Sequence, residues 1–139
     1  MKNFTSKMDK KTGLMTTSFV VFAVAVPFVM YKLGAPRVSL FMVSLIMALA
    51  FITSYMMIPQ LFLNDKTIVI KNNFVNIKIP FGDINTIEEN PKIGLNIRTM
   101  GVGGLFGHFG YFNGNDVWYV TNIHKKVKIE TKTGKIYMI

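Results

Sequence analysis

The acidic and histidine side chains of the second half of the chain have the types that acid–base or metal chemistry requires. They are scattered along the sequence: Asp65, Asp83, Glu88, Glu89, Asp116, Glu130, His108 and His124. Adjacent Glu88 and Glu89 point to opposite sides of a strand, which is poor geometry for a carboxylate pair. Neither histidine has a third ligand at metal-binding spacing, and the chain has no cysteine. We therefore expect no catalytic site, no metal and no cofactor, in a protein that is not an enzyme.

Positive charge points instead to anionic headgroups. The chain has 16 Lys and Arg against 7 Asp and Glu. The bases fall in the first eleven residues, in a short turn at Lys32 and Arg37, and in the segment after residue 64. Bases in such places orient membrane helices and attract anionic lipid. We do not expect nucleic-acid binding, because no basic helix or recognition motif is present.

Two stretches without a charged residue or histidine, Thr12–Tyr31 and Val38–Leu63, predict a pair of membrane-spanning helices. About 20 residues rising 1.5 Å each cover roughly 30 Å of hydrocarbon. We predict helices over about 14–33 and 38–58, with Pro59 ending the second.

The lysine bias places both termini in the cytoplasm and the short turn outside. A cleaved secretory signal is the alternative for the first stretch, because Ala23-Val24-Ala25 resembles a cleavage site. However, the apolar run continues past Ala25 and a second span follows at once. On the second helix, Ser44 with Ala48 and Ala50 with Ser54 are small residues at four-residue spacing. They predict close packing, either against the first helix or against another subunit.

Alternating apolar and polar residues predict short strands after residue 64. One is the run 74–81, which follows the turn-forming pair Asn72-Asn73 and has Val75, Ile77, Ile79 and Phe81 on one face, and another covers 93–100. A last turn at 131–134 needs a left-handed residue, which Gly134 supplies. Its loop has two or three residues, so either Ile136/Met138 or Tyr137/Ile139 faces the core. Six or seven such strands indicate a small sandwich or barrel.

The fold class is therefore α+β: a two-helix transmembrane hairpin followed by a small antiparallel β domain. We assign residues 1–11 to a basic cytoplasmic tail, 12–63 to the hairpin and 64–139 to the β domain.

The most unusual stretch is 101–112, GVGGLFGHFGYF. It matches neither the dinucleotide-binding nor the P-loop pattern. Glycines at this density allow sharp turns and close backbone approach. We expect a long loop tucked under the β domain, with Phe106, Phe109 and Phe112 as plugs and His108 fixing it by a backbone hydrogen bond. A loop that dips into the membrane or binds a partner is the alternative.

The run 103–112, the strand near Trp118–Thr121 and the segment 127–139 together resemble bacterial pleckstrin-homology-like (PH-like) domains of membrane proteins. The resemblance covers roughly residues 60–139. It implies two nearly orthogonal antiparallel sheets, normally closed at one end by a C-terminal helix. The sequence stops at Ile139, where that helix would begin. We therefore expect an open end and a free edge at 135–139, covered by a second copy, a protein partner or the membrane helices.

Eukaryotic relatives of these domains bind phosphoinositides through a basic cluster in the first hairpin. Here that hairpin offers Lys71 and Lys78, which are too few to carry the function over. Bacterial members resemble assembly or scaffolding modules.

We expect a membrane-anchored PH-like binding or assembly module at the cytoplasmic face of the bacterial inner membrane. The partners expected are the lipid bilayer and a protein partner or homo-oligomer. The alternatives are an anionic-lipid sensor and a small accessory subunit of a transporter or membrane-enzyme complex. An ion path through this chain alone is not expected, because neither span holds an ionisable residue. The residues predicted to contact lipid or partner are Arg98, Phe106, His108, Phe109, Lys125, Lys126 and Lys128.

Overall fold

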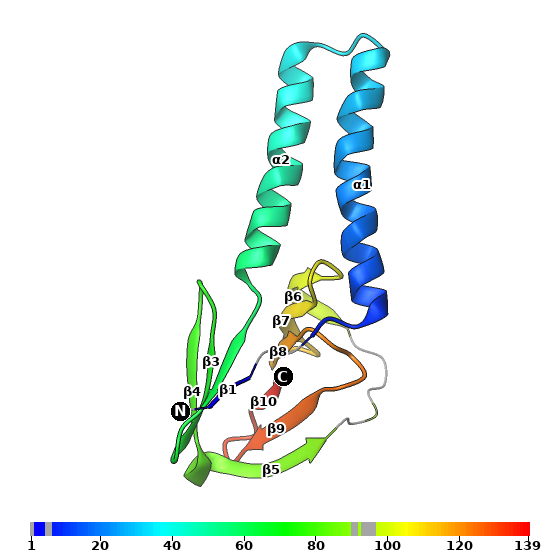
Figure 1. The fold of residues 1–139 in the computed structure, drawn as a ribbon. Helices are drawn as coiled ribbons and strands as arrows, with labels where there is room; N and C mark the ends of the chain where they lie inside the picture. Colours follow the sequence, from blue (N-terminus) through cyan, green and yellow to red (C-terminus); the bar gives the residue numbers. More distant parts are fainter. Residues whose placement is uncertain (1, 5–6, 90–91, 93–96) are drawn as a thin grey trace.

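A computed structural model describes residues 2–4, 7–89, 92 and 97–139. The chain begins with a short strand, β1 (Lys2–Phe4), and continues into two long helices, α1 (Lys10–Lys32) and α2 (Arg37–Met56). The helices form an antiparallel pair that stands on one end of a β domain (Figure 1).

Both helices are long enough and apolar enough to cross a membrane, judged by length and composition. α1 begins four residues before the predicted start because Asp9 caps it, its Oδ1 accepting a hydrogen bond of 2.6 Å from the Thr12 N–H. α2 ends at Met56, since the residue before Pro59 is pushed out of helical conformation. The predicted pair of helices is thus present with small shifts at the ends.

Ser44 and Ala48 of α2 face α1. Together with Ala23 and Phe19 of α1 they line a cavity of about 260 Å³ between the two helices. These two small residues thus face the first helix of the same chain across the cavity, while close packing of the small residues stays a prediction.

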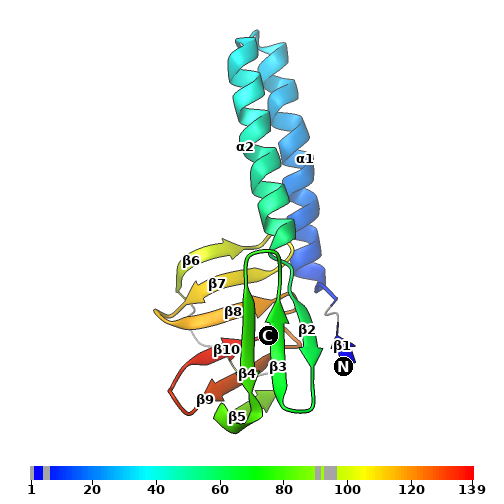
Figure 2. The ribbon, with the colours of Figure 1, turned by 90° about the vertical axis from the view of Figure 1, so that its left-hand side faces the viewer.

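The β domain contains two sheets that pack face to face (Figure 2). Their strands are β2 (Gln60–Leu63), β3 (Thr67–Lys71), β4 (Asn76–Pro80), β5 (Ile84–Glu89), β6 (Arg98–Gly103), β7 (His108–Phe112), β8 (Asp116–Val120), β9 (Val127–Thr131) and β10 (Ile136–Met138), with a 3-10 turn η1 (Phe81–Asp83) before β5. The strand orders are β1-β2-β3-β4 and β5-β9-β10-β8-β7-β6. Neighbouring strands are antiparallel except β8 and β10, which run parallel.

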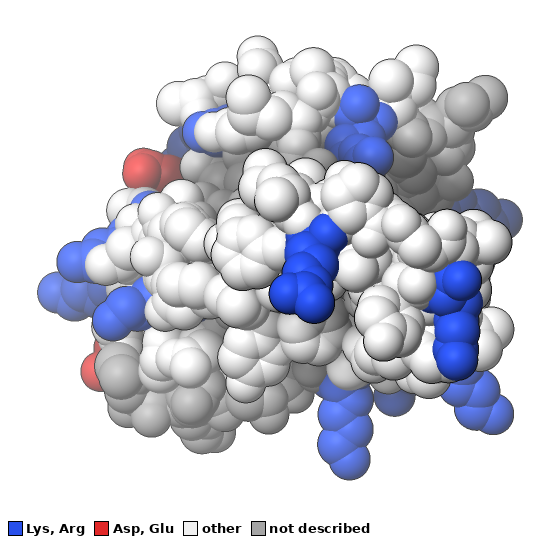
Figure 3. All heavy atoms as spheres, turned by 90° about the horizontal axis from the view of Figure 1, so that it is seen from above, with Lys and Arg blue, Asp and Glu red and all other residues white. Residues whose placement is uncertain are grey.

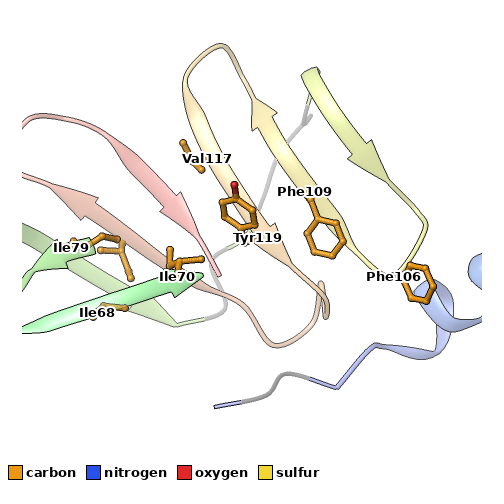
Figure 4. Close-up of a cluster of buried hydrophobic side chains, with 8 residues drawn as sticks. Ile68, Ile70, Ile79, Phe106, Phe109, Val117 and Tyr119 are labelled. Carbon is orange, nitrogen blue, oxygen red and sulfur yellow. The ribbon is translucent and has the colours of Figure 1, made fainter. Parts of the chain in front are cut away.

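The main core lies between the sheets, where alternate residues of β3 and β4 meet those of β7, β8 and β9 (Figure 4). Its buried side chains are Ile68, Ile70, Ile79, Phe106, Phe109, Val117, Tyr119 and Ile129. Ile77 and Ile79 of β4 face inward as predicted, since Asn76, Lys78 and Pro80 are exposed. Phe81, expected on the same face, is 41% exposed because the chain leaves the strand there and enters η1.

A second cluster lies on the outer face of the six-stranded sheet. Phe112 and Trp118 stack there with ring centroids 4.5 Å apart, beside Val120 and Met138. This cluster explains why both faces of β10 are apolar. Ile136 and Met138 face outward, while Tyr137 on the alternate face packs against the main core.

The last hairpin has a three-residue loop, because Thr131 N donates to Lys135 O over 2.9 Å and Glu130 lies opposite Ile136. Gly134 has the predicted left-handed conformation, with φ +79°.

The predicted free edge at 135–139 is wrong. β10 lies inside the sheet, paired with β9 on one side and with β8 on the other, so neither of its backbone edges is free.

Two further expectations need correction. The stretch 101–112 is a β-hairpin of β6 and β7 with a tight turn, and not a long loop. Nine strands follow α2 among the described residues, whereas six or seven were expected. One of the additional strands is β2, which begins directly after Pro59. The strand predicted over 93–100 lies partly outside the described residues, and β6 begins at Arg98.

We expect Gly134→Val to lower the free energy of unfolding by about 1 kcal/mol or more. A β-branched residue is strained at positive φ, and a Cβ at this position would meet open space, so strain is the whole effect. Trp118, which pairs with Met138 of β10, reports the thermal transition in detergent by its fluorescence. Gly82→Val is the control, because Gly82 also has open space but no positive φ. Equal melting temperatures for the two variants would contradict the prediction.

Candidate functional site

The turn between β6 and β7 lies between the domain-facing ends of the two helices. The Phe106 ring packs edge-on against Phe51 and Tyr55 of α2, with centroid distances of 5.1 and 5.5 Å. Its backbone N–H donates to Thr16 Oγ1 of α1 over 3.0 Å. Figure 4 shows Phe106 at the end of the core nearest the helix. A single residue of the β domain thus contacts both helices.

The local sequence allows this turn because it needs unusual backbone angles. Phe106 has φ +59° and Gly104 has φ +103°, and Gly104 N donates to Gly107 O over 2.9 Å to close the turn. A phenylalanine in the left-handed region is uncommon and carries strain. Gly104 also lies against α1, since a Cβ there would be 2.7 Å from Met15 Cε. The packing of Phe106 against the helices therefore offsets the strain of the turn.

Thr16 links this turn to the backbone of α1. Its hydroxyl donates to Thr12 O over 2.9 Å and accepts the hydrogen bond from Phe106 N. Both hydroxyl functions are used, and the side chain is buried. The site lies roughly 7 Å along the helix from Lys11, the last charged residue before Lys32, so it is level with the first turns of the apolar span.

Asp9 makes a second contact between α1 and the β domain. While Oδ1 caps the helix, Oδ2 accepts the Ile123 N–H from the β8–β9 turn over 3.0 Å. Burial alone would raise the pKa of Asp9, but the hydrogen bonds from Thr12 and Ile123 outweigh it and lower the pKa below its usual value. The carboxylate therefore stays ionised at neutral pH. We call Asp9, Thr16, Phe51, Tyr55, Phe106 and Ile123 the helix–domain interface.

Asn122 and Asn72 shape two turns that reach the helix ends. Asn122 Oδ1 accepts the N–H groups of His124 and Lys125, and its Nδ2 donates to Lys7 O before α1. Asn72 Oδ1 accepts two N–H groups of its own turn, and its Nδ2 donates to Met57 O after α2 over 3.0 Å. Asparagine thus stabilises each turn and ties it to the chain flanking a helix.

A basic groove lies beside the N-terminal end of α1. Its volume is about 490 Å³, and its lining residues are Met8, Asp9, Lys10, Lys11, Asn122, His124 and Lys125. Three lysines surround one carboxylate that is already bonded to two N–H groups, so the groove favours an anion. Within the described residues, no group of three or more His, Cys, Asp or Glu is placed to hold a metal ion.

Lys125, one of the sequence-predicted contact residues, lines this groove, and the charges of Asp9 and Lys11 in its lining act on His108, another of them. The Arg98 guanidinium is beside Gly103, where a Cβ would also be 3.4 Å from His108 Nδ1. Burial lowers the pKa of His108; the charge of Asp9 opposes this effect, and those of Arg98 and Lys11 add to it. The imidazole is therefore neutral at pH 7, and it packs edge-on against Phe112.

The structure does not bring the remaining predicted residues together. Phe109 is fully buried in the core, and Lys126 is 7% exposed with its Nζ donating to Ile123 O over 2.7 Å. Lys128 forms an ion pair of 3.3 Å with Glu130 on β9, while Lys125 is exposed at the groove. Contact of these residues with lipid or partner stays a prediction.

Sequence reasoning missed Asp9, Thr16, Asn72 and Asn122, which join the helices to the β domain. Asp9 could have been predicted as the N-cap of the first helix, because Asp directly before an apolar helical run is a typical N-cap. Asn72 indicated a turn but not the helix end that it would meet, and the sequence analysis did not single out Asn122. Thr16 gave no signal within its apolar stretch.

We expect Thr16→Val to lower the free energy of unfolding by about 1–3 kcal/mol, because it leaves the buried Phe106 N–H without its acceptor while keeping the side-chain shape. Thr17→Val is the matched control, since Thr17 is exposed on the next position of α1. Chemical unfolding of the full-length protein in detergent measures both. A Thr16→Val variant as stable as Thr17→Val would show that the hydrogen bond does not hold the interface.

A comparison with known protein families identifies the family of the β domain. The sequence matches the profile of the bacterial PH domain over residues 59–139, from Pro59 through every strand of the domain except β1. No curated protein and no solved structure matches the chain. The match covers more than half of the sequence and agrees with the two packed sheets described above. The chain therefore belongs to the bacterial PH domain family.

Proposed function

We propose that the protein is a membrane-anchored, non-enzymatic binding or assembly module that holds its PH domain in a fixed orientation at the cytoplasmic face of the bacterial inner membrane. PH domains are typically binding modules, and the two apolar helices supply an anchor. In this proposal residues 1–11 are the basic tail, α1 and α2 form the membrane hairpin, and the β domain from β2 (Gln60–Leu63) onward is the binding domain.

The helix–domain interface is the observation that carries the proposal. A domain that merely needed tethering would need only a flexible linker, whereas here Phe106 packs on α2 and hydrogen-bonds to α1, and Asp9 bonds the domain to the start of α1. Aromatic pairs of this kind contribute about 0.5–1.5 kcal/mol each beyond the area that they bury. Such an interface restricts rotation of the domain, so a fixed face is presented to partners.

The basic groove favours a second candidate, an anionic-lipid sensor. Lys10, Lys11 and Lys125 line a groove at the point where α1 enters its apolar span, which is where lipid headgroups lie in a bilayer. Figure 3, which looks down on the helices from above, shows blue side chains near the centre as well as around the outline, and few red ones. Each exposed base near an anionic surface contributes about 1 kcal/mol.

Co-purification in mild detergent, followed by mass analysis of proteins and lipids, tests these functions. A binding module retains its protein partner in the full chain and loses it when residues 64–139 are deleted. An accessory subunit retains the partner through the hairpin alone, which would contradict the proposal. In a lipid sensor, Lys10→Gln, Lys11→Gln and Lys125→Gln together remove an enrichment of anionic phospholipid, whereas Lys78→Gln and Lys132→Gln, away from the groove, leave it unchanged.

Cysteine labelling tests the proposed orientation of the chain in the membrane. We expect cysteines placed singly at Asn3 and Thr133 to be protected from an impermeant thiol reagent in intact cells, and a cysteine at Ala35 to be labelled. The chain has no native cysteine, so each label is unique. The lysine bias of the tail is the physical reason. Labelling at positions 3 and 133 but not 35 would overturn the orientation.

A further inference from the structure

We propose that the turn between β3 and β4 (residues 72–75, the β3–β4 tip) docks on the bilayer surface beside α2 and inserts the ring of Phe74 at the boundary between headgroups and acyl chains. The inference goes beyond the proposed binding function and rests on the proposed membrane anchoring. It assigns the domain a second point of membrane contact, separate from the two helices.

Hydrogen bonds fix the tip at the end of α2. Asn72 Nδ2 donates to Met57 O over 3.0 Å, and Asn73 N donates to Met56 O over 3.4 Å. Met56 is the last residue of α2, and its carbonyl has no partner within the helix. Figures 1 and 2 show the tip beside this helix end in two perpendicular views. The depth of the helix end in the membrane therefore sets the depth of the tip.

The end of α2 lies at the membrane–water boundary. The chain has no charged residue from Val38 to Leu63, so the helix is apolar to its last turn. Tyr55 in that turn is 61% exposed, in the place where aromatic side chains with a polar group gather at membrane interfaces. A segment bonded to Met56 and Met57 is consequently level with the headgroups.

Phe74 is a large apolar side chain exposed at this level. It is 56% exposed, and its backbone N–H is held by Asn72 Oδ1 over 2.8 Å, as is that of Val75. The turn is therefore ordered before it meets lipid, so docking its ring costs little conformational entropy. An exposed aromatic at headgroup depth gains by entering the apolar boundary.

The space between the tip and α2 has the mixed character of the interfacial layer. A cleft of about 300 Å³ is lined by Tyr55 and Pro59 on one side and by Lys71 and Asn72 on the other. Lys71 is exposed, and its long stem lets the ammonium remain in water while the stem covers apolar surface. A bilayer boundary offers both the polar and the apolar partners that such a cleft requires.

The same hairpin provides a matched comparison. Phe81 follows β4 at the opposite end of the hairpin, away from the helices, and is 41% exposed. The two phenylalanines are thus similar in exposure and differ in distance from the helix ends. Bilayer docking predicts lipid contact for Phe74 and none for Phe81.

Tryptophan fluorescence in vesicles tests the proposal. Phe74→Trp, Phe81→Trp and Leu49→Trp are made singly in the full-length protein, with unchanged melting temperature as the criterion of folding. Each is reconstituted in phosphatidylcholine and phosphatidylglycerol vesicles with or without bromine on the acyl chains. Signals are read as the difference from the native chain, whose one tryptophan, Trp118, is 2% exposed. Leu49, 52% exposed in the middle of α2, is the membrane control.

We expect bromine to quench position 74 and position 49, with blue-shifted emission at both, and to leave position 81 unquenched. Unquenched, red-shifted emission at position 74 places the tip in water and overturns the proposal. Blue-shifted but unquenched emission at position 74 means that protein, such as a second copy of the chain, covers the tip, which also overturns it. Absence of quenching at position 49 contradicts the membrane anchoring itself, so the two failures are distinguishable.

Discussion

The hydrogen-bonding groups at the two domain-facing helix ends are the constraint on which the rest of the structure depends. Such groups border an apolar layer in the proposed membrane setting, where an unpartnered N–H or C=O costs several kcal/mol. Asp9 supplies the acceptor at the start of α1, and the tip of the β3–β4 hairpin supplies donors to the carbonyls at the end of α2. At the end of α2 the β domain itself supplies the missing donors, whereas at the start of α1 it donates the Ile123 N–H to the capping carboxylate of Asp9. These bonds fix the position of the domain relative to both helices.

Both helix ends use the same local device, an asparagine that builds a turn with its oxygen and reaches a flanking carbonyl with its nitrogen. Asn72 acts after α2 and Asn122 before α1. Phe106 lies between them and packs on α2 while its N–H bonds to α1. Three turns from distant parts of the sequence thus each contact a helix or the chain that flanks it, which explains how a small domain is held without a long linker.

The sequence predicted those features that depend on local pattern. The charge-free runs gave the helices, the alternation in β4 gave its buried face, and Gly134 gave a positive φ. Features that depend on pairing between distant residues were not predictable in this way. The glycines of the stretch 101–112 predicted a long loop, but this stretch is the β6–β7 hairpin. Gly101 and Gly110 lie opposite each other there and let the two backbones approach closely. The candidate site was the least predictable part, because Thr16 matters only through the turn that meets it.

The strand edges limit how another protein can join this domain. β5 and β6 are the edges of the six-stranded sheet, and each has a register shift in its pairing with its neighbour. Bulges of this kind, with the charged pair Glu88-Glu89 on β5, oppose addition of a further strand. Figure 2 shows β6 nearest the helices and β5 farthest from them. Both edges of the six-stranded sheet thus oppose pairing with a further strand, and β10 is enclosed within it, whereas β1 and β4 form the edges of the four-stranded sheet.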